Sequence, residues 1–232
     1  MGQAASTRVR RIPSVSNENI GRLFGVLRRS YRTWNAPVVT FISTHTGDPY
    51  RTLTGCILSL RTQDAVTAEA SKRLFALAPN ASALARVPEG KLARTIYPVG
   101  FYRTKARTLR AIARILLDRF DGRVPDTIDE LLGLPGVGRK TANLVVSQAY
   151  GKPGICVDTH VHRITNRWGY VKTKTPEQTE MALREKLPAK HWPEINHLLV
   201  AFGQTICHPT SPHCSTCPVA TDCPRIGVVR SR

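Results

Sequence analysis

The chain has 232 residues, of which 41% are hydrophobic and 22% charged, so it can bury a sizeable core and is not disordered as a whole. Its 34 Lys and Arg residues exceed its 16 Asp and Glu residues, which gives a formal net charge of +18. A surplus of this size is typical of proteins that bind a polyanion, such as nucleic acid or an anionic membrane face. No apolar run approaches the ~20 residues that span a bilayer, and no signal region opens the chain. We therefore expect no membrane partner and a cytoplasmic or nucleoid location, nuclear in a eukaryote.

The spacing of apolar residues predicts an all-α chain without internal repeats. Residues 1–16 are interpreted as a disordered basic leader, and apolar positions recur at helical spacing from Asn17 onward. Asp64 is expected to cap one helix, and Thr175 precedes another that starts at Pro176. No alternation of β-branched residues indicates a strand. The further helices are expected over residues 50–60, 64–78, 103–120, 126–132, 139–150, 158–168, 176–187 and 193–206, with a short one from 88.

The long helix predicted over residues 103–120 has a strongly basic polar face. Such a row is ordinarily a solvated helix face, and with this net charge the alternative is that it also lies along phosphates. The row consists of Arg103, Lys105, Arg107, Arg110 and Arg114.

A glycine-containing turn separates two of the predicted helices. Glycines at two of its positions allow a tight turn and a close approach to another surface. The helix that follows presents free N–H groups and a positive dipole end, which can hold a phosphate without reading a base. A G-x-G pair alone is more often just a turn, but Leu-Pro before it and Arg-Lys-Thr-Ala after it favour a DNA-binding helix-hairpin-helix. Its expected DNA-binding residues are Pro135, Gly136, Val137, Gly138 and Arg139.

Two motifs together carry a family resemblance. Leu-Pro-Gly-Val-Gly-Arg-Lys-Thr-Ala-Asn (134–143) and Val-Asp-Thr-His-Val (157–161) resemble the signature of the helix-hairpin-helix (HhH-GPD) DNA glycosylase superfamily. The chain is most similar to the endonuclease III branch, and the resemblance extends over about residues 50–223.

The resemblance implies a two-lobed helical fold with the lesion bound between the lobes. One lobe is expected to be a six-helix bundle over residues 42–152 that includes the hairpin. The other is expected to combine residues 17–41 with 153–232 and to carry an iron–sulfur cluster loop. The implied partner is damaged double-stranded DNA, and we expect a monomer with no obligate protein partner.

Lys140 and Asp158 are the candidate catalytic residues. Lys140 falls in the first turn of the second hairpin helix, whose positive end lowers an amine pKa, whereas a nearby carboxylate raises it. A helix over 139–150 is about 18 Å long, and eight extended residues span roughly 26 Å, so the chain can return Asp158 to Lys140. The alternatives are a lysine that only contacts phosphate and an aspartate that only caps its helix.

In the family that the chain resembles, the matching lysine is the nucleophile, and the matching aspartate assists base departure and stabilises positive charge on the sugar. The resemblance thus implies a bifunctional DNA glycosylase/AP lyase for base excision repair. It would excise oxidised pyrimidines by base flipping, Schiff-base formation on Lys140 and β-elimination. The alternatives are a monofunctional mismatch or adenine glycosylase, which usually lacks this lysine, and a non-catalytic DNA-binding iron–sulfur protein.

Two further segments are similar to the family's DNA-inserting loops. A flipped base leaves a gap that a side chain must fill. Arg61 stands where family members commonly carry Gln, so the plugging residue departs from the family here. Phe101 matches the second loop, where an apolar wedge is expected, and a core aromatic is the alternative.

The six cysteines fall into two groups. Cys56 and Cys156 lie singly in apolar surroundings, where we expect buried thiols. Zinc ribbons usually pair two C-x2-C knuckles, whereas the remaining cysteines contain one, and ferredoxin spacings do not fit either. Their spacing matches the [4Fe–4S] loop of the endonuclease III family, so the resemblance implies this cluster in a structural role. Its expected ligands are Cys207, Cys214, Cys217 and Cys223.

Overall fold

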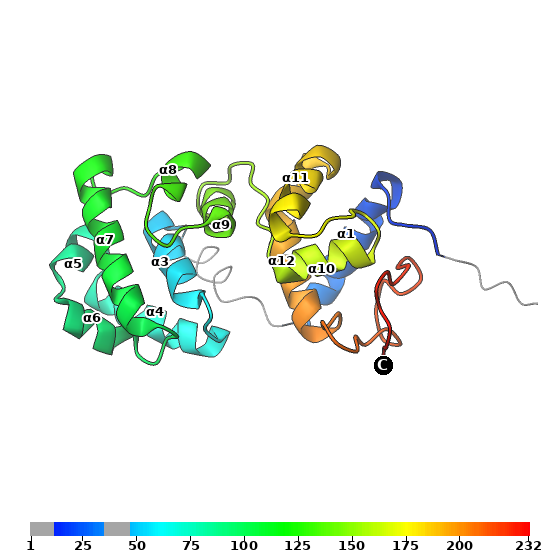
Figure 1. Cartoon of the computed structure of the whole chain (residues 1–232), viewed down its shortest axis with the longest axis horizontal. Coiled ribbons are helices and arrows are strands. Elements are labelled where there is room, and N and C mark those ends of the chain that lie inside the picture. Colours follow the sequence, from blue (N-terminus) through cyan, green and yellow to red (C-terminus); the bar gives the residue numbers. More distant parts are fainter. Residues whose placement is uncertain (1–11, 35–46) are drawn as a thin grey trace, which may run out of the picture.

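The computed structural model describes residues 12–34 and 47–232, and every regular element in these residues is helical, which confirms the predicted all-α class. Figure 1 shows two lobes side by side. The first contains α3 (Pro49–Ser59), α4 (Asp64–Leu77), α5 (Ala81–Arg86), α6 (Glu89–Ile96), α7 (Tyr102–Phe120), α8 (Ile128–Leu132) and α9 (Arg139–Ala149). The second contains α1 (Asn17–Tyr31), α10 (Thr159–Arg167), α11 (Pro176–Lys186), the 3-10 turn Ala189–His191, α12 (Trp192–Thr205) and the C-terminal cysteine loop.

Each lobe has its own hydrophobic core. In the first lobe, Leu53 of α3 and Leu109 of α7 are completely buried in a cluster formed by α3–α9. In the second, Phe24 of α1 lies in one cluster with Trp168 and Phe202, because α1 packs against α12. The helix nearest the N-terminus therefore belongs to the lobe formed by the C-terminal third of the chain.

Helix starts follow local capping chemistry. Ser16 and Asn19 form a reciprocal capping box at α1, and Thr175 caps α11 as expected. The prediction for Asp64 is wrong: Gln63 occupies the cap position, and Asp64 is the first helical residue, where its carboxylate faces the positive end of the dipole. Helix α5, capped by Asn80, was not predicted, because six residues are too few to show a helical period.

The leader and lobe boundaries expected from the sequence fall partly on residues 1–11 and 35–46, which lie outside the described part of the chain. The end of the proposed leader joins the second lobe. Val15 is 2% exposed, and its N–H donates to the carbonyl of Trp168 at 2.9 Å.

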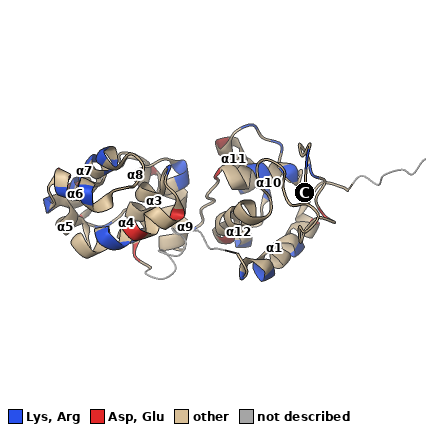
Figure 2. Cartoon of the chain, turned by 90° about the horizontal axis from the view of Figure 1, so that it is seen from below, with Lys and Arg blue, Asp and Glu red and all other residues tan. Residues whose placement is uncertain are grey.

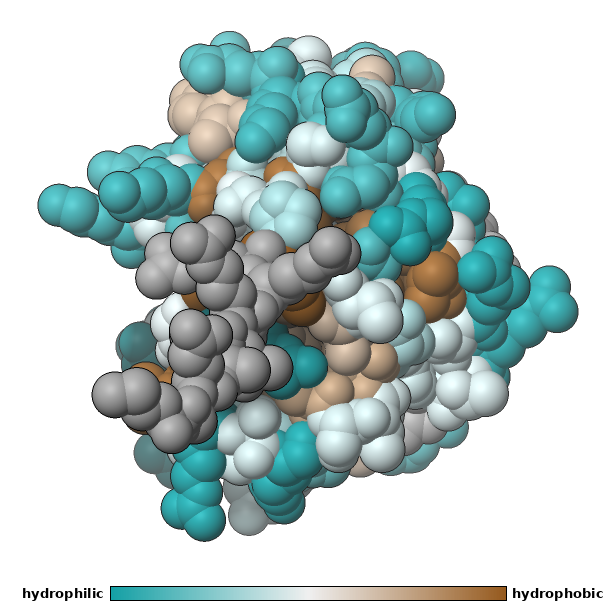
Figure 3. Space-filling model, turned by 90° about the vertical axis from the view of Figure 1, so that its right-hand side faces the viewer, coloured by the Kyte–Doolittle hydropathy of each residue, from teal (hydrophilic) through white to brown (hydrophobic). Residues whose placement is uncertain are grey.

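The surface carries the excess positive charge on both lobes. Figure 2 shows Lys and Arg on helices of each lobe, including α6, α7 and α10, with fewer acidic residues. Figure 3 shows the outer end of the second lobe, where hydrophilic residues surround small apolar areas. Among the described helices, none has the length and apolar character to cross a membrane.

A buried carboxylate links the two lobes. Glu180 of α11, whose side chain is 4% exposed, accepts two hydrogen bonds from Arg139 of α9, at 2.6 and 3.1 Å. It also accepts from Arg184 Nε at 3.0 Å and from Asn143 Nδ2 at 3.2 Å. Burial by itself raises the pKa of Glu180, but the hydrogen bonds from the two arginines outweigh it and lower the pKa. The start of the hairpin helix α9 is thus fixed to α11.

We expect Glu180→Gln to reduce the free energy of unfolding by about 2 kcal/mol at neutral pH, because it removes charge-assisted hydrogen bonds from a buried site. Denaturant titration of both proteins measures this difference. Since the folded pKa is lowered, the difference should be complete above the ordinary value of 4.5 and shrink as the pH falls through the folded pKa. Glu185→Gln, at an exposed position on the same helix, is the matched control. An equal loss in both variants would contradict the assignment.

Candidate active site

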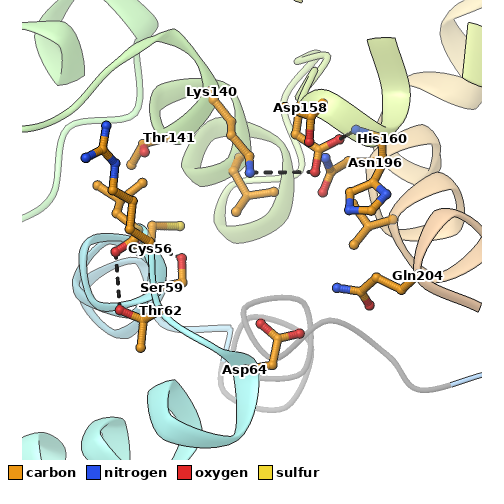
Figure 4. Close-up of a pocket in the computed structure, with 15 residues that line it drawn as sticks. Cys56, Ser59, Thr62, Asp64, Lys140, Thr141, Asp158, His160, Asn196 and Gln204 are labelled. Atoms are coloured by element: carbon orange, nitrogen blue, oxygen red, sulfur yellow. Dashed lines mark hydrogen bonds and ion pairs between the residues drawn. The ribbon is translucent and has the colours of Figure 1, made fainter. Parts of the chain in front are cut away.

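A pocket of about 510 Å³ lies between the lobes, within the size range of small-molecule sites. One wall comes from the corner between α3 and α4, and the start of α9 contributes a second. The second lobe supplies the start of α10 and one face of α12 (Figure 4). Both lobes must therefore be in place for the pocket to exist.

Lys140 and Asp158 face each other in this pocket (Figure 4). Lys140 is the second residue of α9, and its Nζ lies 3.7 Å from Oδ2 of Asp158. The other carboxylate oxygen, Oδ1, accepts from the N–H groups of His160 and Val161 at 2.9 Å each, so Asp158 caps α10. The lysine side chain is 51% exposed and the aspartate 9%. A fixed carboxylate thus faces an amine that a ligand can reach.

Asp158 keeps Lys140 protonated at rest. Burial is the largest single influence and lowers the pKa of Lys140, whereas Asp158 is the largest influence in the opposite direction, and the net pKa is raised. Cys56 and Cys156 lie nearby, and burial raises the pKa of Cys56 to about 12 and that of Cys156 well above its ordinary value. These thiols are therefore neutral near pH 7, and Asp158 is the charge that acts on Lys140. The amine must lose a proton before it can attack.

The predicted hairpin joins α8 to α9 and presents its backbone. Gly136 has a φ of +74°, and a Cβ there would lie 3.1 Å from Cγ2 of Thr108. Gly138 is the N-cap of α9, and no described side chain caps this helix start. The guanidinium of Arg139 is bound to Glu180. The N–H of Val137 donates to the carbonyl of Leu134 at 3.2 Å, so the anion-binding groups of this segment are the N–H groups at the uncapped start of α9.

The two predicted insertion loops lie against each other. The guanidinium carbon of Arg61 is 5.6 Å from the ring centroid of Phe101. Both residues have a positive φ, +51° and +58°, which is unfavourable for L side chains. Phe101 is 63% exposed and is therefore not a core aromatic.

The expectation of a solvated basic face on α7 is wrong at Lys105. This residue is 6% exposed and donates to the carbonyl of Leu58, in the last turn of α3, and to that of Leu60, which follows α3. Arg103 and Arg107 on the same helix are exposed, as predicted.

The comparisons with known proteins agree with this geometry. Residues 54–189 match the family model described as HhH-GPD superfamily base excision DNA repair protein. The chain is 48% identical to endonuclease III of Thermotoga maritima over 176 residues, which cover 76% of this chain and 83% of that one. The chain belongs to the endonuclease III family. It is thus a base-excision repair DNA glycosylase and AP lyase.

Other relatives and solved structures support this membership. Endonuclease III-like protein 1 of Bos taurus is 43% identical, with 82% of this chain and 66% of that one covered. A non-covalent endonuclease III–DNA complex superposes with a TM-score of 0.79 at 33% identity, covering 90% of this chain and 95% of that one. A trapped endonuclease III–DNA covalent intermediate gives 0.77 at 32% identity, covering 90% and 96%.

The four C-terminal cysteines of the chain line one pocket with apolar walls that include Trp168 and Phe202. Arg167 of α10 donates to Sγ of Cys207 at 3.2 Å and to the carbonyl oxygens of His208 and Pro209 at 2.7 Å each. Within residues 12–34 and 47–232, no group of three or more His, Cys, Asp or Glu side chains is arranged to hold a single metal ion.

The sequence reasoning missed several pocket residues, among them His160, Asn196 and Gln204. His160 lines the pocket, and its Nδ1 lies 3.0 Å from a guanidinium nitrogen of Arg163. Asn196 and Gln204 line the pocket from α12 together with Val200. Their spacing of four residues places them on one helix face, but sequence alone does not show that this face meets α9.

We expect Asp158→Asn to move the pH dependence of Schiff-base formation toward lower pH. Below its raised pKa, the amine fraction of Lys140 grows about tenfold per pH unit, and loss of the carboxylate lowers that pKa. Asn preserves the cap of α10. The measurement is the rate of borohydride trapping on DNA that already carries an abasic site, as a function of pH. Asp126→Asn, which removes the carboxylate paired with Lys152 at 2.8 Å, serves as the control. Superimposable profiles for wild type and Asp158→Asn would exclude this role.

Proposed function

We propose that this protein excises oxidised pyrimidines from duplex DNA and then cuts the strand, with Lys140 as nucleophile and Asp158 as its charge partner. The observation that carries the proposal is the 3.7 Å ion pair in a pocket that both lobes line. The DNA complexes among the similar structures, one of them covalent, support DNA as the partner.

The chemistry follows from the two side chains. A flipped nucleotide enters the pocket, and Lys140, once it has lost a proton, attacks the sugar carbon that bears the base. The bond from this carbon to the base nitrogen breaks, and the base leaves with the electron pair and takes up a proton. Asp158 stabilises the positive charge that develops on the sugar. Ring opening then gives a Schiff base on Lys140, and loss of a proton from the neighbouring sugar carbon expels the 3′ phosphate.

DNA would be held at two places around the pocket. The hairpin, Pro135–Arg139, offers backbone N–H groups to a phosphate. Arg61 and Phe101 would enter the base stack, since both lie at the surface on adjoining loops. The basic residues on both lobes (Figure 2) would add phosphate contacts that carry no sequence information.

We assign a [4Fe–4S] cluster to Cys207, Cys214, Cys217 and Cys223. Four cysteine thiols around one pocket with apolar walls suit a [4Fe–4S] cluster, in which each iron takes one thiolate ligand. When bound, the cluster supplies a cross-link within the C-terminal loop. Arg167 would contact both a ligand sulfur and the backbone of that loop.

We further propose that the protein acts as a monomer without an obligate protein partner, in the cytoplasm and nucleoid or in a nucleus. The two lobes are assigned to residues 42–152 and to 17–41 with 153–232, and each contains one of the two cores.

We expect borohydride to trap the protein covalently on duplex DNA that contains an oxidised pyrimidine, and Lys140→Ala to abolish the adduct. Denaturing electrophoresis measures the adduct and strand cleavage together. Lys152→Ala, a lysine paired with Asp126 outside the pocket, is the control and should still be trapped.

The two alternatives predict other outcomes. A monofunctional mismatch glycosylase, as suggested by a thymine-DNA glycosylase of 26% identity and TM-score 0.76, would release the base without an adduct. A non-catalytic protein would bind the duplex and release nothing. Either result would contradict the proposed lyase.

Protein purified without oxygen should be brown and contain about four iron and four sulfide per chain. Cys217→Ala should lose colour and iron, because it removes one of the four proposed ligands, whereas Cys56→Ala, in the first lobe, should retain both. Absorption spectra and metal analysis measure this. A colourless wild-type protein with one zinc would refute the cluster.

A further inference from the structure

Lys105 is a buried lysine outside the candidate active site. It lies in the first turn of α7 and is 6% exposed, on the same helix face as the buried Leu109 and Ile112. Burial lowers the pKa of Lys105 to about 8. An apolar side chain of similar length would fill this position without desolvating a charge. We therefore expect the positive charge of Lys105 to have a functional role at this position.

The Lys105 ammonium binds the loop that connects α3 to α4. Its Nζ donates to the carbonyl oxygen of Leu58 at 2.8 Å, to that of Leu60, and to Oγ1 of Thr62 at 3.1 Å. Three acceptors match the three protons of an ammonium. They bracket Arg61, the residue with φ +51°.

The same contacts join the first insertion loop to the second. The N–H of Gly100 donates to Oγ1 of Thr62 at 3.1 Å. A Cβ on Gly100 would lie 2.5 Å from the carbonyl oxygen of Arg61, so the two backbones touch at this point. Phe101 follows directly, with φ +58° and its ring beside the Arg61 guanidinium.

We propose that Lys105 is a positioning residue for base flipping: its ammonium clamps the 58–62 loop to the 99–102 loop, so that Arg61 and Phe101 enter the duplex as one stacked unit. This inference rests on the proposed function, because it assumes that these loops enter DNA. Arg61 also lines the interlobe pocket, so the clamp fixes the insertion unit relative to Lys140.

The test compares two substrates that differ in their need for insertion. A single-stranded oligonucleotide with an abasic site presents its sugar to Lys140 without a base stack to open, whereas a lesion in a duplex requires insertion. Lys105→Met should slow single-turnover trapping on the duplex by roughly 10- to 100-fold, as expected for a misplaced positioning group. Trapping on the single strand should change by less than about twofold, because the pocket chemistry is untouched. 2-Aminopurine placed beside the lesion should show a matching loss of base-flipping fluorescence.

A double-mutant cycle separates positioning from general structural damage. In the Arg61→Ala/Phe101→Ala background, Lys105→Met should cause little further loss on duplex DNA, since the unit that it positions is absent. Lys91→Met, the same substitution at an exposed site on α6, should leave both rates unchanged. Should Lys105→Met fail to fold, Thr62→Val removes the hydroxyl shared by both loops and tests the same clamp.

Two results would overturn the clamp: an equal loss on single-stranded and duplex DNA, or an undiminished effect of Lys105→Met when Arg61 and Phe101 are absent. Failure of the proposed function gives a different pattern, because wild-type protein would then be trapped on neither substrate.

Discussion

The carboxylate of Asp158 is the constraint on which the site depends. One oxygen holds the first N–H groups of α10, and the other faces Lys140, so the start of a helix and the charge of the site are fixed by one side chain. Lys140 is fixed independently, because its neighbour Arg139 is bound to Glu180 of α11. Because Lys140 belongs to the first lobe and Asp158 to the second, their ion pair forms only when the two lobes keep this relative position.

On the side of the pocket that contains Arg61, strained loop backbone fixes the wall, whereas a helix cap fixes the side that contains Asp158. Arg61 and Phe101 both occupy the left-handed region, which costs on the order of 1 kcal/mol or more for each L residue. Such conformations persist only where the surroundings enforce them. Here the contact of Gly100 with the Arg61 carbonyl and the bonds of Lys105 do so. The pocket therefore lies between a wall held by a helix cap and a wall held by strained loops.

The sequence predicted the parts that local chemistry determines. Helices α7, α9 and α11 agree with the predicted bounds within about a residue, and α1 begins at Asn17 as expected, because period and caps are local signals. The return of Asp158 toward Lys140 followed from chain reach. Lys105 was wrongly assigned to the polar face because it is charged. Its spacing from Leu109 and Ile112 places it on the buried face of the helix. The partners of Glu180 lie 37 and 41 residues away on α9, and no local pattern shows that α9 and α11 meet.

The raised pKa of Lys140 is compatible with its proposed role as nucleophile. Asp158 can stabilise first the ammonium of Lys140 and later the positive charge on the sugar. In the free enzyme it stabilises the ammonium of Lys140, which keeps the amine unreactive. A nucleotide that fills the pocket excludes water, and desolvation lowers the amine pKa. In the proposed reaction, positive charge develops on the sugar as the base departs, and the carboxylate that held the ammonium would then stabilise this second cation. A buried, helix-capping carboxylate suits both tasks, since its position does not change between them.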